Sequence, residues 1–192
     1  MTRRHEILRE MGLTPVWKLR KEPAPVVEEN GWIEIKKAVP ACTACGLHKS
    51  RTQTVFGVGD EQADWLFIGE APGGDEDRLG EPFVGQAGKL LDNMLGAIGL
   101  NRNEDVYICK VLKCRPPGNR NPEPGEVEHC TPFLKRQIAL IRPKLIVAMG
   151  RFAAQTLLSS DASIASLRGK VYRYEGVALI VTYHPAYLLR NL

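Results

Sequence analysis

A glycine-rich stretch directly after an apolar run constrains this chain more than any other feature. Trp65 to Ile68 has the pattern of a buried strand, and the sequence GEAPGGDED follows it at residues 69–77. Glycine and proline allow tight turns and a close approach of the backbone to a ligand. A strand, a glycine loop and then a helix are typical of ligand sites at the carboxyl end of a strand in α/β proteins. Taken alone, such a loop is also compatible with a simple connection.

The rest of the chain repeats this alternation of strands and helices. Strands are predicted at 65–68, 105–112 and 144–149, helices at 85–98, 123–141 and 151–158, and a hairpin at 171–174 and 178–182. Apolar residues at helical spacing place Leu91, Met94, Leu95 and Ile98 on the core side of the first of these helices. Alternating elements of this kind predict an α/β fold with a largely parallel sheet.

Length and charge limit the organisation of the chain without fixing its function. A chain of 192 residues suits one domain, which we place at 39–192 behind an N-terminal extension and linker at 1–38. A short helix near Ile7, a basic run at 18–21 and a second short helix at 32–38 are expected in that extension. No apolar run reaches the ~20 residues of a membrane helix, and no signal peptide is visible, so a cytoplasmic location is expected. The net charge of +4 permits nucleic-acid binding but does not require it.

Four of the five cysteines are candidates for a metal site. Cys42 and Cys45 form a CxxC pair, while Cys114 and Cys130 lie far downstream and sixteen residues apart. Four thiolates suit a tetrahedral zinc ion, and they also suit a cubane iron–sulfur cluster, whose ligands need not come in tight pairs. The spacing leaves both open. Cys109 lies within a predicted strand and is expected to be a buried core residue.

Several motifs taken together resemble those of the family 4 uracil-DNA glycosylases, the iron–sulfur members of the uracil-DNA glycosylase superfamily. The motifs are CTAC at 42–45, GEAPG at 69–73, EPFVG at 81–85, KCRPP at 113–117 with Asn119 and Arg120, Cys130, and HPAYLLR at 184–190. They occur in the family's order. The resemblance implies a three-layer α/β/α fold around a central, largely parallel four-stranded sheet.

The resemblance also implies a cofactor and an activity. It favours a [4Fe–4S] cluster over zinc, bound by Cys42, Cys45, Cys114 and Cys130 in a structural role. It implies that the protein, acting as a monomer, removes uracil from single- or double-stranded DNA. Such an enzyme flips the target nucleotide out of the helix and hydrolyses its N-glycosidic bond.

Individual site residues follow from the same resemblance. Phe83 matches the aromatic residue on which the base stacks, and His184 matches the histidine beside the base carbonyl. Glu70 matches an acidic residue that positions the attacking water or stabilises the cationic sugar, and Gly69 and Ala71 would line the pocket. From the residues alone, Phe83 is also compatible with a core phenylalanine, and His184 with a turn residue.

A second group of residues is expected to contact DNA. Leu188, Leu189 and Arg190 match the loop that enters the duplex as a wedge. Arg115 and Arg120 are expected at phosphates. Further candidates for phosphate contacts, with a solvated surface as the alternative, are Lys49, Arg51, Lys113 and Lys170. Asp75, Glu76 and Asp77 would repel phosphates, and we expect them in a solvated loop. The alternative is a backbone-shaping or sugar-facing role for one of them.

Lys110 departs from the family pattern. The family usually has an asparagine at this position, four residues before the third cluster cysteine, which reads the uracil edge. An amide both accepts and donates hydrogen bonds, whereas an ammonium group only donates. We therefore expect poorer discrimination between uracil and other bases. The alternative functions are an iron–sulfur protein that binds DNA but has weak or altered catalysis because of Lys110, and an iron–sulfur electron carrier.

Overall fold

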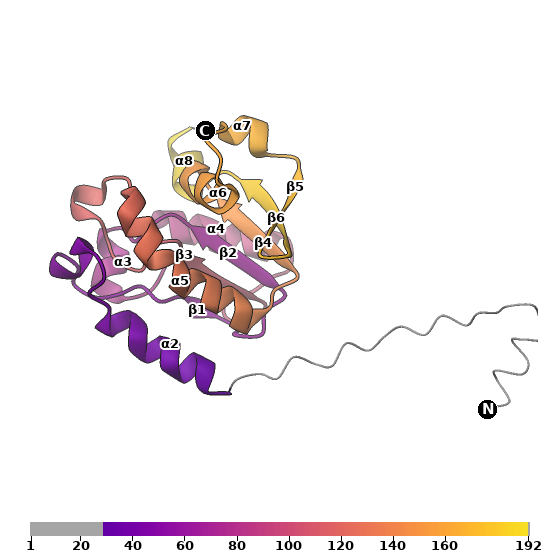
Figure 1. Cartoon of the computed structure of the whole chain (residues 1–192). Coiled ribbons are helices and arrows are strands. Elements are labelled where there is room, and N and C mark those ends of the chain that lie inside the picture. Colours follow the sequence, from indigo (N-terminus) through magenta and orange to yellow (C-terminus); the bar gives the residue numbers. More distant parts are fainter. Residues whose placement is uncertain (1–28, 192) are drawn as a thin grey trace, which may run out of the picture.

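The computed structural model describes residues 29–191, so the helix expected near Ile7 and the basic run at 18–21 lie outside the described residues. A twisted sheet runs through the centre of the molecule (Figure 1). Its strands are β1 (Val58–Gly59), β2 (Trp65–Gly69), β3 (Val106–Lys110), β4 (Leu145–Met149), β5 (Val171–Tyr174) and β6 (Val177–Thr182).

The strand order in the sheet is β1-β3-β2-β4-β6-β5. The four central strands, β3, β2, β4 and β6, are parallel, while β1 and β5 pair antiparallel at the two edges. The predicted parallel four-stranded sheet is therefore confirmed as the centre of a wider sheet. The predicted hairpin is also confirmed, because β5 pairs with β6.

Helices cover both faces of the sheet. They are α2 (Glu29–Ala41), α3 (Gly74–Leu79), α4 (Gln86–Ala97), α5 (Pro124–Ile141), α6 (Arg151–Leu158), α7 (Ile164–Leu167) and α8 (Pro185–Arg190). Two short 3-10 turns, η1 (Gly46–Lys49) and η2 (Pro117–Asn119), precede β1 and α5. None of the helices in residues 29–191 is both long and apolar enough to span a bilayer.

Successive strand residues point to opposite faces and divide the core into two halves. Leu66 and Ile68 of β2 belong to the half that packs against α5, α6 and α7. Phe67, between them, belongs to the half that packs against α4, and α8 packs on α4 in turn. Cys109 lies in the first half and is fully buried, as expected. The three-layer α/β/α architecture is thereby confirmed.

Helix α2 joins this core through its contact with α5 (Figure 1). The sequence predicts a helix at 32–38, and the helix in the structure is longer at both ends. Ile35 and Val39 are buried, and the ring of Trp32 packs near Phe56 and Tyr107. The expected boundary between residues 38 and 39 falls inside this helix.

The core face of α4 is narrower than the sequence predicts. Leu91 and Leu95 are buried, but Met94 is only half-buried and Ile98 is 60% exposed. The physical reason is the end of the helix: Ala97 is its last residue, and Ile98 already has non-helical backbone angles. The prediction of Ile98 as a core residue is wrong.

Gly88 on α4 provides a test of how closely the helix packs. A Cβ atom at Gly88 would collide with the backbone carbonyl of Phe83, whereas one at Gly96 on the same helix meets no atom within 4 Å. We expect Gly88→Ala to lower the free energy of unfolding by about 1–3 kcal/mol through overpacking. The matched variant Gly96→Ala should raise it by about 0.5–1 kcal/mol because alanine favours helix.

Urea unfolding followed by circular dichroism measures both effects. Equal stability of the two variants would contradict this close packing of α4 against Phe83.

Candidate functional site

A cavity of about 450 Å³ opens at the carboxyl ends of the parallel strands. Glu70 directly follows β2, Lys110 is the last residue of β3, and Arg151 begins α6 just after β4. His184 lies two residues beyond β6, and Phe83 reaches the cavity from the loop before α4. Carboxyl strand ends are where α/β proteins bind their ligands. The structure thus brings together four predicted site residues, Glu70, Phe83, Lys110 and His184.

The ring of Phe83 is held in place through its backbone. Phe83 has a left-handed backbone with φ of 57°, which is uncommon for a non-glycine residue and must be held by its surroundings. Its N–H donates to the Glu76 carboxylate, and its carbonyl accepts from Arg102 Nη1 at 3.0 Å. A Cβ at Gly69 would lie only 2.9 Å from Phe83 Cζ. Phe83 is both a core residue and part of the cavity wall.

His184 combines a structural and a chemical role. It is the N-cap of α8, and its Nδ1 accepts the N–H of Ala186 at 3.1 Å. Burial lowers the pKa of its imidazole to about 4, assisted by the charge of Lys110 and opposed by that of Glu76. The neutral ring with Nδ1 as acceptor carries its proton on Nε2. His184 therefore supplies a neutral N–H donor at the cavity, stacked against Phe83 with a centroid distance of 5.3 Å.

Glu70 is a half-buried carboxyl at the cavity wall. Burial raises its pKa, while the charges of Lys110 and Arg151 oppose this rise. A raised pKa makes a carboxylate a better proton acceptor near neutral pH. Ala71 lines the same wall, whereas Gly69, which was also expected there, is buried and is not among the residues that line the cavity.

The three acidic residues after the glycine loop do not form a solvated loop. They begin helix α3, where carboxylates are favourable beside the free N–H groups of the first turn. Only Asp75 is exposed. Asp77 is buried and accepts the Thr52 N–H with both oxygens at 3.0 Å, while buried Glu76 accepts the Gly73 N–H at 2.6 Å. The expectation is wrong for Glu76 and Asp77, because their carboxylates bind backbone N–H groups, whereas Asp75 is solvent-exposed as expected.

Lys110 lies inside the pocket, as its position in the sequence predicts, but it is not a free cation. Its side chain is 3% exposed, and its Nζ is 3.0 Å from Glu76 Oε1. The same Nζ lies 3.8 Å from the centroid of the Phe83 ring. Burial lowers the pKa of Lys110, and the adjacent charge of Glu76 opposes this.

All four candidate ligand cysteines line a second, smaller cavity between η1, the segment after β3, and α5. These residues are Cys42, Cys45, Cys114 and Cys130. Burial raises the pKa of Cys114, and that of Cys130 to about 11. Two of the sulfurs accept hydrogen bonds. Arg51 Nη1 donates to Cys114 Sγ at 3.1 Å, and the Lys113 backbone N–H donates to Cys130 Sγ at 3.2 Å. Within residues 29–191, no three Cys, His, Asp or Glu side chains gather around a point suited to one metal ion.

Arg51 and Lys113 are not available to phosphates. Arg51 also donates to the Pro40 and Cys42 carbonyls at 2.6 and 3.0 Å, so its guanidinium is committed to the cysteine segment. Lys113 is 1% exposed, and its Nζ donates to the Lys110 carbonyl at 2.7 Å. The suggestion that they contact phosphates is therefore wrong. Lys49 and Lys170 are exposed.

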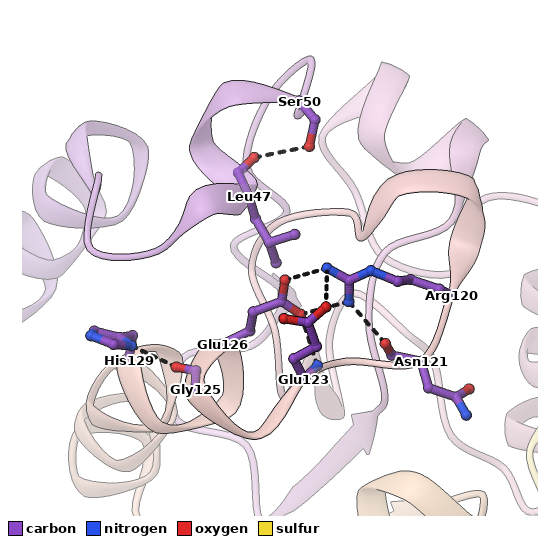
Figure 2. A network of polar contacts seen from close by, with 8 residues as sticks. All are labelled: Leu47, Ser50, Arg120, Asn121, Glu123, Gly125, Glu126 and His129. Atoms are coloured by element: carbon purple, nitrogen blue, oxygen red, sulfur yellow. Dashed lines mark hydrogen bonds and ion pairs between the residues drawn. The ribbon is translucent and has the colours of Figure 1, made fainter.

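The predicted phosphate-binding arginines lie on the loop that follows Cys114. Figure 2 shows the guanidinium of Arg120 facing the carboxylates of Glu123 and Glu126. Its two contacts to Glu126 measure 2.6 and 3.0 Å, and they lower the pKa of that carboxyl. Arg115 Nε donates to Asn119 Oδ1 at 2.7 Å. These contacts hold the loop on the first turn of α5, and Arg120 also lines the main cavity.

The residues predicted as a wedge form the helix α8 in this structure. Leu189 is 42% exposed, Leu188 is half-buried, and Arg190 lines the main cavity. Tyr187, which sequence reasoning did not single out, is 44% exposed and stacks on Tyr183 with a centroid distance of 5.1 Å. Tyr187 and Leu189 are thus exposed on the helix whose Ala186 and Arg190 line the cavity.

Comparison with known proteins shows which family the chain belongs to. A model of the Uracil DNA glycosylase superfamily matches residues 56–192. The chain belongs to this superfamily. It is 52% identical to a Type-4 uracil-DNA glycosylase of Archaeoglobus fulgidus, with 81% of this chain and 82% of the relative covered. Type-4 uracil-DNA glycosylases of Sulfurisphaera tokodaii and Thermotoga maritima are 47% and 46% identical, covering 82% of this chain and 76% and 82% of their own lengths.

Sequence reasoning missed some residues that hold this superfamily member's site together. Glu76 and Arg102 fix the backbone of Phe83, and Arg51 donates to a cysteine sulfur. A carboxylate in the first turn of a predicted helix was a usable signal for Glu76. No local pattern indicates Arg102, because its partner lies nineteen residues earlier in the chain.

The buried imidazole of His184 gives this superfamily member a testable pH dependence. Its folded pKa of about 4 lies below the ordinary 6.5, so the unfolded chain binds more protons between these values. The free energy of unfolding should therefore fall as the pH is lowered from 6.5 to about 4. His184→Asn removes this contribution and should flatten the dependence across the window, as measured by urea unfolding at a series of pH values.

The exposed His129 on α5 provides the matched control, since His129→Asn also removes one imidazole. Identical slopes for the wild type and His184→Asn would contradict the neutral, buried state of His184.

Proposed function

We propose that this protein is a uracil-DNA glycosylase that excises uracil in DNA base-excision repair. The observation that carries the proposal is the convergence of Phe83, His184 and Glu70 on one cavity at the carboxyl ends of the strands. An aromatic face, a neutral N–H donor and a carboxylate are the groups that hydrolysis of a base–sugar bond requires. The 52% identical Archaeoglobus fulgidus relative bears this activity in its name.

The cavity receives a nucleotide that has been flipped out of the DNA. Flipping costs a few kcal/mol, and stacking of the base on the Phe83 ring returns ~1–3 kcal/mol of that cost. The left-handed backbone of Phe83, fixed by Glu76 and Arg102, holds the ring in place before the base arrives. Leu189 and Tyr187 on α8 present apolar surface to fill the vacated stack.

Hydrolysis breaks the bond between the sugar C1′ and the base nitrogen. The bonding electrons leave with the base, and a water oxygen bonds to C1′. The Nε2–H of His184 donates to the base carbonyl, where negative charge accumulates only as the bond breaks. We assign water activation to Glu70, because its raised pKa suits it to accept the water proton.

The second cavity is the proposed site of a [4Fe–4S] cluster bound by Cys42, Cys45, Cys114 and Cys130. In a cubane each thiolate binds a different iron, so the four sulfurs need not surround one point. This agrees with cysteines that share a cavity without forming a mononuclear site in the described residues. When bound, the cluster supplies a cross-link between the CxxC segment and the loop that carries Arg115 and Arg120.

Uracil in single- or double-stranded DNA is the proposed substrate, and a monomer is the proposed functional unit. Arg115 and Arg120 are the proposed phosphate contacts beside the cavity, with Lys49 and Lys170 as exposed additional candidates. An electron carrier is not favoured, because relatives that are 46–52% identical to this chain are named Type-4 uracil-DNA glycosylases. The remaining alternative is a DNA-binding protein that Lys110 has left with weak catalysis.

Incubation with a labelled oligonucleotide containing one uracil, followed by alkali, tests the activity directly. We expect cleavage at the uracil and none in the matched thymine oligonucleotide. His184→Asn should lower the rate by ~10²–10³, as loss of one transition-state donor does in other enzymes. DNA binding without cleavage by the wild type would support the binding-protein alternative instead.

Metal and sulfide analysis of anaerobically purified protein tests the cofactor. We expect iron and labile sulfide in the ratio of a [4Fe–4S] cluster and a brown colour, both lost in Cys114→Ser and Cys130→Ser. Cys109→Ala is the matched control, since Cys109 is a buried cysteine of the core and lies outside the cysteine cavity. Stoichiometric zinc in place of iron would contradict the cluster.

A further inference from the structure

Three planar side chains outside the cavity lining form a stack that ends on α8. The rings of Tyr183 and Tyr187 lie 5.1 Å apart between their centroids, with 19° between their planes. The guanidinium of Arg168, the C-cap residue of α7, lies 4.1 Å from the centroid of the Tyr183 ring. Tyr183 is half-buried, whereas Tyr187 is 44% exposed. The stack therefore holds an aromatic ring at the surface of the protein.

The geometry of α8 places this ring beside the cavity lining. Ala186 and Arg190 are four residues apart, so they share one face of the helix, and both line the cavity. At 3.6 residues per turn, Tyr187 lies about 60–100° to one side of this face, and Leu189 lies about 60–100° to the other. A DNA strand that delivers a nucleotide to the cavity along this face therefore has an exposed apolar side chain on each side of it.

The stack makes the Tyr187 ring a prepared surface for another planar group. Contact with the Tyr183 ring restricts its rotation, so less side-chain entropy is lost when a ligand binds. The Arg168 cation over Tyr183 holds the second ring in turn. A nucleobase of any type presents a π face that stacks on an aromatic ring. Leu189 has no planar surface, so the two exposed residues of α8 differ in what they bind.

The charges around the stack indicate that its ligand belongs to a strand of nucleic acid. Arg168, Lys170 and Arg190 are exposed, and none of them forms an ion pair with a carboxylate within residues 29–191. Cations of this kind attract phosphates. Aromatic faces beside such cations are a common way to bind unpaired bases. One phosphate joins a nucleotide in the cavity to its neighbour, so the neighbouring base lies within reach.

We propose that the Tyr187 ring, held by Tyr183 and Arg168, is a binding site for the unpaired base next to the flipped uridine in single-stranded DNA. The proposal rests on the proposed function, because the flipped uridine brings its neighbour to α8. It adds to that function a subsite for a base that is not excised. In a single strand this base has no pairing partner, so stacking on Tyr187 breaks no base pair.

Three single-stranded oligonucleotides, each with one uracil, test the proposal. One is unmodified, and the others carry a tetrahydrofuran residue, which has a sugar and phosphate but no base, on the 5′ or the 3′ side of the uracil. We expect Tyr187→Leu to lower kcat/KM about fivefold or more on the unmodified oligonucleotide, as loss of one base–aromatic stack does. The loss should lie in KM, because the neighbouring base stacks equally in the substrate complex and the transition state. It should disappear on the oligonucleotide that lacks the base bound by Tyr187.

Two further variants serve as controls. Tyr187→Phe keeps the aromatic face and should keep the wild-type values on all three oligonucleotides. Val171→Ala removes apolar surface from β5 at a side chain that is 73% exposed and outside the cavity lining, and it should also leave all three values unchanged. Circular dichroism checks the folding of each variant.

The outcomes separate this subsite from the glycosylase function. A loss in Tyr187→Leu that is equal on all three oligonucleotides, or absent on all three, would overturn the subsite and leave the glycosylase function intact. Failure of the wild type to excise uracil from any of them would overturn the glycosylase function, and the subsite with it.

Discussion

The carboxylate of Glu76 is the interaction on which the pocket depends. A buried charge is costly unless hydrogen bonds and an opposite charge compensate it. Glu76 has both, since it accepts the N–H groups of Gly73 and Phe83 and pairs with Lys110. These partners belong to the start of α3, the loop before α4, and the end of β3. One side chain therefore fixes the Phe83 ring, the glycine loop and the buried cation of Lys110 relative to one another.

The architecture was predictable because buried strands and helices require apolar residues at characteristic spacings in the sequence. The parallel strands are apolar along most of their length, and the helices between them show apolar residues at helical spacing, so element types and order follow. The short edge strand β1 carries little of this signal, with only Val58 and Gly59 paired to β3. Ile98 was misplaced for a related reason: periodicity does not show where a helix ends, and α4 stops at Ala97.

The site was predictable where a residue directly follows a strand, and less so where its partner lies far along the chain. Glu70, Lys110 and His184 lie at or just beyond the carboxyl ends of neighbouring parallel strands, so their convergence is a consequence of topology. Asp77 binds the N–H of Thr52, twenty-five residues earlier. Arg51 lies sixty-three residues before Cys114. No local sequence pattern connects such pairs. The assumption that charged side chains are solvent-exposed therefore fails for carboxylates and cations that form hydrogen bonds to buried polar groups.

The two cavities share one short segment of backbone. Lys113 donates its N–H to Cys130 Sγ and its Nζ to the carbonyl of Lys110, and it is almost fully buried. A lysine buried this deeply is retained only where its donors are satisfied. Lys113 therefore links the cysteine cavity to Lys110 in the wall of the main cavity. Through this lysine, a structural role for the proposed cluster would extend to the geometry of the pocket, without any transfer of electrons.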